Sequence, residues 1–493
     1  MSSSDFSVHG QGGSQFEVFV LNVIPPLSIL IRNLLVPWVS QGHQFDTHGV
    51  SYWWKFLLDF ILIALPVAGS MTIFANHLEY MVIAMLVVVL MMVLFMVMEY
   101  HMVSKERLNT RLIMNRIIEE HHSPTKFLTY FRSSVLLSVL VAILAVDFRV
   151  FPRRFAKTEN YGHSQMDVGV TAFICCNAMV KPLKTTLRRE ENETRNVNRR
   201  FPLLYSPTFA LVVLGIARTV VMELLQYPHE VTEYGLHWNF FYTLAVVTVV
   251  SRVLPAQFSI VTALVFSIVH QTILFNGIQE WVMDPAAARD DLVSANKEGI
   301  YSLLGYLALF YFSRAIGRFI SKTGLRLKSW ALCCVHLLVI SAVFRLLQIP
   351  AESLAGPHSR KLVNLSFIFA QMSLFCFFAS LHLMVQVAAY IAWAAKIPHC
   401  GSDENPFAKI EPCIMGAINK HGFAFFLLAN LATGAVNMVA PSLFGVGASH
   451  ELCSEVAVSI LVLYSLFCCA FAHFLNSRRS PSQNPSGNNH SFN

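Results

Sequence analysis

The chain has 493 residues, of which 55% are hydrophobic and only 13% are charged, and its formal net charge is +7. A soluble domain carries roughly 25% charged residues. The composition therefore excludes an ordinary soluble protein and, with a mean hydropathy of +0.53, indicates a polytopic membrane protein. No run of lysine and arginine resembles a nucleic-acid-binding arm. The ten cysteines show no zinc-site spacing, so we expect no metal.

Apolar runs define the expected elements, because a spanning helix needs about 20 apolar residues. Thirteen candidate spans lie near 17–38, 56–75, 79–98, 128–146, 167–180, 206–225, 238–256, 257–276, 300–318, 329–348, 362–390, 421–440 and 453–474. Pro25, Pro26 and Arg32 interrupt the first, which could be tilted or re-entrant, and the eleventh could be one helix or two. We predict an all-α membrane bundle of about 13 helices, forming one domain over 1–476, with a disordered cytosolic tail over 477–493.

Charged loops predict the orientation of these spans. Lysine and arginine concentrate in 99–127, 181–205, 314–328 and the start of the tail, which thirteen spans place on one side. The positive-inside rule assigns that side to the cytosol. The segment 277–299 on the other side is net acidic. We therefore expect a lumenal N-terminus, a cytosolic C-terminus and a lumenal loop between the fourth and fifth spans.

That loop, 147–166, carries more cations than the rule allows for a lumenal segment. Its first thirteen residues hold six ionisable groups, namely Asp147, Arg149, Arg153, Arg154, Lys157 and Glu159. Pro152 prevents one continuous helix. Charges at bilayer depth are costly and by default indicate a functional site. Either the local topology differs, or the cations serve an anionic ligand, which is the interpretation we favour.

Asp147 and Lys157 are the first candidates for chemistry. Asp147 ends the apolar fourth span, where a carboxylate at a dry rim can accept a proton from a hydroxyl. Lys157 could hold that carboxylate or stabilise a developing oxyanion. The alternative is a structural ion pair that fixes the loop. Asn160 and His163 lie in the same polar stretch and are candidate substrate contacts.

A second polar stretch follows the sixth span. Glu230, Glu233 and His237 have the spacing of one helical face, so a metal site is conceivable. Pro228 and Gly235 would interrupt such a helix, however, and favour a polar loop.

Asn296 and Arg218 are further candidates. Asn296 precedes the ninth span, where it could cap the helix or help a helix N-terminus to bind phosphate. Arg218 lies inside the sixth span, and an arginine at a helix centre costs roughly 2.5–3.5 kcal/mol. It could pair with Glu223 or another carboxylate, or reach a lipid phosphate. Polar residues of the twelfth span, such as Asn437, are typical of helix–helix contacts.

Several motifs follow one another between about residues 140 and 440. They include Ile143-Leu-Ala-Val-Asp147-Phe, Phe151-Pro-Arg-Arg-Phe-Ala-Lys-Thr-Glu159, Thr232-Glu-Tyr-Gly-Leu-His-Trp-Asn-Phe-Phe241 and Ala295-Asn-Lys-Glu-Gly299. In this order they resemble the inositol acyltransferase family of glycosylphosphatidylinositol (GPI) anchor biosynthesis, the PIG-W type. The block from Asp147 to Glu159 is the most specific. The resemblance implies an endoplasmic reticulum enzyme that moves a fatty acyl group, typically palmitoyl, from acyl-CoA to the inositol 2-hydroxyl of glucosaminyl-phosphatidylinositol.

The resemblance also implies that Asp147 and Lys157 are catalytic. We take Asp147 as the general base and Lys157 as the group that orients it or stabilises the oxyanion. No bound cofactor is expected, because the thioester of the co-substrate acyl-CoA is already activated. The predicted substrate-binding residues are Arg149, Arg153 and Arg154, for phosphate, together with Asn160, His163, Arg218, His237 and Asn296.

Two other classes of protein remain open. A secondary transporter would need facing intramembrane charges and inverted repeats, and no repeat is visible in the sequence. A different membrane-bound O-acyltransferase would use an Asn/His pair, for which His237 and Asn239 are the candidates. The expected partners are acyl-CoA, the glycolipid and the bilayer, and the oligomeric state is not predicted.

Overall fold

The computed structural model describes residues 10–39, 49–103, 125–191, 207–224, 231–254, 258–323, 327–394 and 413–478. The regular structure in these ranges is helical, with no strand and two isolated β-bridges, Gly10 with Thr158 and Gly13 with His163. The all-α prediction is therefore confirmed for the described part of the chain. The predicted disordered tail lies outside it from residue 479 onward.

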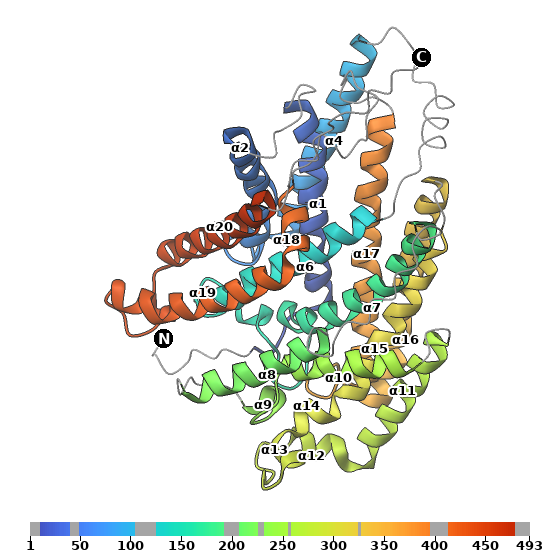
Figure 1. Ribbon diagram of the computed structural model, residues 1–493, viewed down its shortest axis with the longest axis vertical. Coiled ribbons are helices and arrows are strands. Elements are labelled where there is room, and N and C mark those ends of the chain that lie inside the picture. The colour runs from blue at the N-terminus through green and yellow to red at the C-terminus, as the bar shows by residue number, and fades with distance from the viewer. Residues whose placement is uncertain are drawn as a thin grey trace, which may run out of the picture. The chain divides into compact units, whose positions relative to one another are not determined.

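The chain divides into two compact units. Unit 1 comprises Met1–Val23, Ile118–Leu128 and Pro152–Val387, and unit 2 comprises Ile24–Ile117, Thr129–Phe151 and Ala388–Asn493. The division falls within three helices, α1 (Gln15–Val39), α6 (Thr125–Ala145) and α17 (Leu365–Ala394) (Figure 1). Asp147 belongs to unit 2 and Lys157 to unit 1.

Unit 1 is built around α15. Its elements are η3 (Arg153–Phe155), α7 (Gln165–Glu191), α8 (Pro207–Leu224), α9 (Val231–Tyr234), α10 (Phe240–Val253), α11 (Ser259–Ile273), η5 (Leu274–Ile278), α12 (Gln279–Met283), α13 (Leu292–Ala295), α14 (Lys297–Tyr301), α15 (Leu303–Ser321) and α16 (Leu327–Ala355). Helix α15 packs against α7 and α11. A glycine permits the contact with α7, because a Cβ on Gly317 would lie only 2.8 Å from the Met179 carbonyl oxygen. The helix that follows the loop of Lys157 is thereby fixed to α15.

Unit 2 holds the helices that flank the Asp147 end of the loop. Its elements are α2 (Val50–Asp59), η2 (Phe60–Ala64), α3 (Leu65–Ser70), α4 (Leu78–Val103), α18 (Ile414–Lys420), α19 (Gly422–Leu443), η6 (Ser449–Glu451) and α20 (Ser454–Arg478). Helix α20 packs against α3, α18 and α19.

Helix α1 is uninterrupted despite its prolines. A buried ion pair neutralises its arginine, Arg32. Arg32 Nε and Nη2 lie 2.8 and 3.1 Å from the two carboxylate oxygens of Asp59. Lys55 Nζ lies 3.7 Å from the same carboxylate, and all three side chains are fully buried. The backbone N–H of Ile414 also donates to Asp59. Because an uncompensated charge inside a membrane is costly, this pairing explains how an arginine is accommodated within α1.

In the residues that the structure describes, each of the thirteen predicted runs lies mostly within a helix. Ten helices in the described ranges are long and apolar enough to cross a membrane. Three shorter apolar helices, Gln165–Val180, Thr208–Val221 and Phe240–Val253, coincide with the fifth, sixth and seventh predicted spans. The total of about 13 spans stays a prediction, whereas the eleventh run is one long helix, α17.

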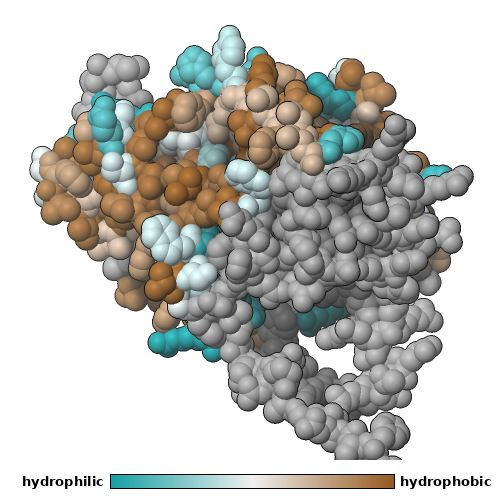
Figure 2. Space-filling view, turned by 90° about the horizontal axis from the view of Figure 1, so that it is seen from above, coloured by the Kyte–Doolittle hydropathy of each residue, from teal (hydrophilic) through white to brown (hydrophobic). Residues whose placement is uncertain are grey.

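The least buried of these ten spans, Leu78–Met98, is also the most apolar. Only 6% of the span Leu78–Met98 is buried, compared with 78% of Lys126–Ala145. A helix that is apolar on every side and still exposed is typical of a lipid-facing span. Figure 2 shows hydrophobic residues over much of the coloured part of one face. The chain is therefore a multi-pass membrane protein.

We predict that Asp59→Asn destabilises the fold by about 3–5 kcal/mol, because it removes the buried counter-charge of Arg32 and Lys55. The measurement is thermal unfolding of the purified protein in detergent. Glu79→Gln is the matched control, since Glu79 is an exposed carboxylate of the same unit. Equal melting temperatures for wild type and Asp59→Asn would contradict the prediction.

Candidate functional site

Asp147 lies in the turn that follows α6, where its N–H donates to the Leu144 carbonyl oxygen at 3.1 Å. Its half-buried carboxylate accepts a hydrogen bond of 2.7 Å from Asn437 Nδ2 on α19. Ser449 Oγ in turn donates to Asn437 Oδ1 at 3.0 Å. The aspartate is thus oriented by a side-chain amide, which is itself held by a hydroxyl.

The loop changes direction at Pro152, as predicted. Pro152 has an extended backbone (φ −63, ψ 131) and is followed by the single turn η3. Beyond it, the N-terminal segment pairs with the loop, since Gly10 N donates to the Lys157 carbonyl and Gly13 N to the His163 carbonyl. Both bonds are short, at 3.0 and 2.7 Å. The backbone is therefore fixed at Lys157 and at His163.

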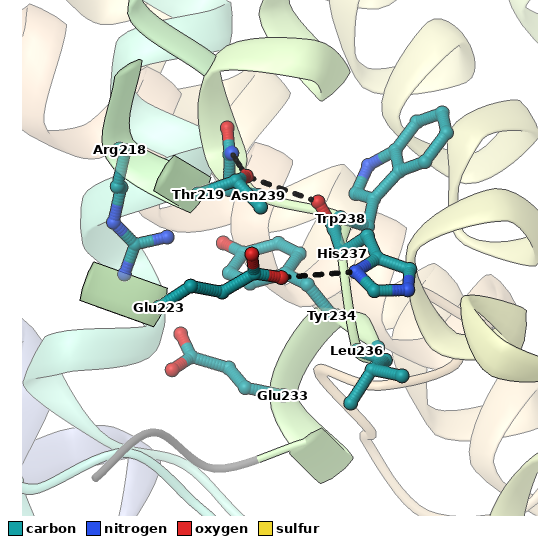
Figure 3. Close-up of a pocket in the computed structure, with 10 residues that line it drawn as sticks. Arg218, Thr219, Glu223, Glu233, Tyr234, Leu236, His237, Trp238 and Asn239 are labelled. Carbon is teal, nitrogen blue, oxygen red and sulfur yellow. Dashed lines mark hydrogen bonds and ion pairs between the residues drawn. The ribbon is translucent and has the colours of Figure 1, made fainter. Parts of the chain in front are cut away.

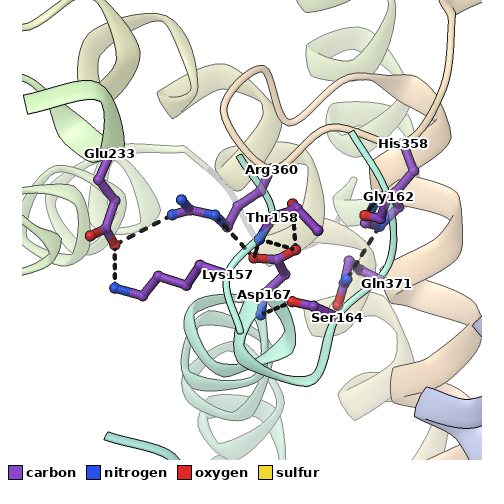
Figure 4. A network of polar contacts seen from close by, with 9 residues as sticks. All are labelled: Lys157, Thr158, Gly162, Ser164, Asp167, Glu233, His358, Arg360 and Gln371. Carbon is purple, nitrogen blue, oxygen red and sulfur yellow. Dashed lines mark hydrogen bonds and ion pairs between the residues drawn. The ribbon is translucent and has the colours of Figure 1, made fainter. Parts of the chain in front are cut away.

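Lys157 belongs to a chain of alternating charges (Figure 4). Its Nζ donates to Glu233 Oε1 at 2.7 Å, and Arg360 Nη1 donates to the same oxygen at 3.3 Å. Arg360 Nε forms an ion pair with Asp167 Oδ1 at 3.0 Å. Thr158 Oγ1 donates to the other oxygen of Asp167 at 2.7 Å. Two cations and two carboxylates thus alternate along one network.

Mutual neutralisation allows these groups to be buried. Arg360 and Asp167 are 4% and 0% exposed, whereas Lys157 and Glu233 retain 32% and 19% exposure. Burial alone would raise the pKa of Glu233, but the Lys157 ammonium and the Arg360 guanidinium lower it to about 2. Burial opposes the charge of Arg360, but Glu233 and Asp167 raise its pKa above the ordinary value. Glu233 is therefore a carboxylate at neutral pH.

The segment before α17 holds the far end of the loop. Lys361 Nζ donates to Asn160 Oδ1 at 2.9 Å. His358 Nδ1 lies 2.8 Å from the Gly162 carbonyl oxygen, and the rings of His163 and His358 are 4.1 Å apart. Burial lowers the pKa of His163 to about 4, so it is neutral at physiological pH.

A pocket lies beside Glu233 (Figure 3). It is lined by Arg218, Thr219, Glu223 and the segment from Glu233 to Asn239, and encloses about 60 Å³. Arg218 is exposed within the last two turns of α8, and it forms no ion pair with any described residue. His237 Nδ1 is 3.9 Å from Glu223 Oε1. The lining therefore combines an arginine with two carboxylates.

A tight turn shapes one wall of this pocket. Helix α9 ends at Tyr234, and Gly235 has φ +114, so Glu233 and His237 do not share a helix; the predicted interruption at Gly235 is confirmed. A Cβ on Gly235 would lie 2.5 Å from the Asn296 Cα. Asn296 Oδ1 accepts hydrogen bonds of 2.8 Å from the N–H groups of His237 and Trp238. Glu230 and Pro228 lie outside the described residues.

Asn239 has structural bonds at the start of α10. Its side chain accepts from Phe241 N at 3.1 Å and donates to the Gly215 carbonyl at 2.9 Å. This N-cap also ties α10 to α8. The Asn/His pair is thus present in one pocket wall, but the asparagine amide is occupied by the backbone.

The predicted residues fall into several groups. In unit 1, Lys157 contacts Glu233, which lines the same pocket as Arg218 and His237. Asn160 and His163 instead contact the 358–361 segment. Arg154 Nε pairs with Glu17 on α1 at 2.7 Å, and Arg153 lies beside it in η3. In unit 2, Arg149 is exposed and has no ion pair among the described residues. Substrate contact by each of these residues stays a prediction.

The structure adds residues that sequence analysis did not assign to the site: Arg360, Asp167 and Asn437, and the role of Glu233 as the partner of Lys157. A signal for Arg360 was present in the sequence. Together with Lys361 it places two cations in a short loop on the predicted lumenal side, the same anomaly that singled out the loop of Lys157. Asn437 carried no such signal, because a polar residue in a span usually serves helix packing.

Comparison with known proteins identifies the relatives of the chain. The GWT1 family model matches residues 2–475. "Glucosaminyl-phosphatidylinositol-acyltransferase PIGW" of Bos taurus is 30% identical, with 96% of each chain covered. The protein of the same name from Homo sapiens is 30% identical over 85% of this chain and 88% of its own. "GPI-anchored wall transfer protein 1" of Aspergillus oryzae is 30% identical over 92% and 93%. The predicted resemblance is confirmed, and the chain belongs to the GWT1 family.

Proposed function

We propose that the chain transfers a fatty acyl group from acyl-CoA to the 2-hydroxyl of inositol in glucosaminyl-phosphatidylinositol, as a step of GPI-anchor biosynthesis. The observation that carries the proposal is the near full-length similarity to proteins named as glucosaminyl-phosphatidylinositol acyltransferases. In unit 1, the partly exposed Lys157 and Glu233 also place charged groups beside a pocket, where a lipid headgroup could bind.

The reaction needs a base, because a secondary alcohol attacks a thioester effectively only if its proton is removed. In our proposal, Asp147 accepts the hydroxyl proton while the inositol oxygen bonds to the thioester carbon. The tetrahedral intermediate then breaks its C–S bond, and coenzyme A leaves as the thiol after receiving that proton. Asn437 positions the carboxylate through its 2.7 Å hydrogen bond.

Lys157 is proposed to stabilise the negative charge that develops on the thioester oxygen. Glu233 holds its ammonium at 2.7 Å, and the partial exposure of Lys157 leaves a side on which substrate can approach. Arg149, Arg153 and Arg154 are proposed to bind phosphate of the lipid or of coenzyme A. Asn296 supports the pocket turn through its two backbone hydrogen bonds.

The proposed location is the endoplasmic reticulum membrane, with the N-terminus and the Asp147–Lys157 loop in the lumen and the C-terminus in the cytosol. The contacts of Lys157, Glu233 and Arg360 join three loops that the predicted topology puts on one side. This agreement supports the assignment of the three loops to the same compartment.

We predict that Asp147→Asn and Lys157→Ala each lower acyl transfer by roughly 10²–10⁴-fold, the usual contribution of a general base or an oxyanion-stabilising group. Inositol acylation of added glycolipid is measured in microsomes. Glu159→Gln, an exposed carboxylate of the same loop, should retain activity. Full activity in either of the first two variants would end the assignment. A complete loss in His237→Ala with Asp147→Asn active would instead favour the Asn/His mechanism.

We also predict that Asn437→Ala lowers kcat by about tenfold and leaves KM nearly unchanged, because it loosens the Asp147 carboxylate without touching substrate. Asn430→Ala is the control, since the exposed Asn430 donates only to the Phe426 carbonyl of its own helix. Steady-state kinetics of both variants check this. An unchanged kcat in Asn437→Ala would show that the amide does not position the base.

A further inference from the structure

We propose that the pocket lined by Arg218, Glu223, Glu233 and His237 recognises the free ammonium group of the glucosamine, with the two glutamates as its acceptors. The proposal rests on the proposed function and specifies where the enzyme distinguishes its headgroup. It makes Glu223 and Glu233 specificity-determining residues.

The two carboxylate oxygens of Glu233 differ in their contacts. Lys157 Nζ and Arg360 Nη1 both contact Oε1. Among the described residues, Oε2 has no hydrogen-bond partner, and the side chain remains 19% exposed. Figure 3 shows this carboxylate pointing toward the space that Arg218 and Glu223 also face. One oxygen therefore holds the network, and the other is open to a donor in the pocket.

The charged groups that line the pocket are also suited to an ammonium ligand. Glu223 is 65% exposed, and its nearest partner, His237 Nδ1, is 3.9 Å away, beyond hydrogen-bond distance. The pocket thus offers two acceptor groups with unused capacity, and Arg218 as a cation without an ion pair in the described part of the chain. A ligand that carries both an ammonium and a phosphodiester matches these charges, and charge-assisted hydrogen bonds are the stronger class.

The pocket is also small. Its volume of about 60 Å³ accommodates a few water-sized groups, such as the amine-bearing edge of a sugar. An N-acetyl group would remove the positive charge and add bulk at that position. A site built for charged hydrogen bonds rejects a ligand that leaves its groups unpaired. The pocket should therefore favour the free amine over the acetamide.

The experiment compares two substrates on the purified full-length protein in phosphatidylcholine nanodiscs. These are glucosaminyl-phosphatidylinositol and its N-acetylated form, each with palmitoyl-CoA, and the readout is the ratio of their kcat/KM values. Glu233 also contacts Lys157, so Glu233→Gln is expected to lower both rates; the ratio isolates recognition of the amine. We expect wild type to favour the free amine, and Glu233→Gln and Glu223→Gln each to reduce the ratio about tenfold or more.

Glu280→Gln is the matched control, because Glu280 is an exposed carboxylate of unit 1 outside the pocket; its ratio should equal that of wild type. Glu223→Gln, at an exposed position, serves as the test should Glu233→Gln fail to fold. An unchanged ratio in the folded pocket variants overturns the proposal, while continued inositol acylation leaves the proposed function intact. Inactivity of wild type toward both substrates would overturn the proposed function itself.

Phosphatidylethanolamine presents the same combination of ammonium and phosphodiester. A final experiment therefore tests whether the pocket also binds this lipid. Adding it to the nanodiscs should leave the rate with glucosaminyl-phosphatidylinositol unchanged. Competitive inhibition that disappears in Glu223→Gln would show that the pocket takes ammonium lipids in general, and would overturn selective recognition of the glucosamine.

Discussion

One carboxylate oxygen, Oε1 of Glu233, joins the loop that carries Lys157 to the segment that carries Arg360. In surroundings as apolar as these, each charge is tolerable only beside an opposite one. The sequence Lys157, Glu233, Arg360, Asp167 satisfies that requirement and draws three loops, distant in the chain, to one place. Both the ion pair with Glu233 and the hydrogen bond of its own backbone to Gly10 therefore fix the position of Lys157.

Unit 2 also contains paired charges in apolar surroundings. Arg32 and Lys55 share the carboxylate of Asp59 with all three side chains buried, and the result is a fastening of α1 to α2. In unit 1 the lysine and the glutamate remain partly exposed and border a pocket. A structural ion pair can be fully buried, whereas the charged groups of a binding site must be accessible from a pocket. The contrast distinguishes the two clusters without reference to their residue types.

The sequence predicted those features that depend on local chemistry. Apolar runs located the helices, Pro152 and Gly235 marked breaks that the structure contains, and misplaced cations singled out the loop of Lys157. The contacts between residues that are distant in the sequence were not predictable in this way. Glu233 is 76 residues from Lys157, and helices that are apolar on every side do not reveal which neighbours they face. Asn437 likewise looked like a helix-packing residue until its bond to Asp147 was seen.

The most direct test of the catalytic role of Asp147 is an experimental structure of the protein with glucosaminyl-phosphatidylinositol bound. We expect the inositol 2-hydroxyl to lie within about 3.2 Å of the Asp147 carboxylate, the reach of a general base. A headgroup seated away from Asp147, with its hydroxyl facing another base, would contradict the central claim that this aspartate activates the acceptor.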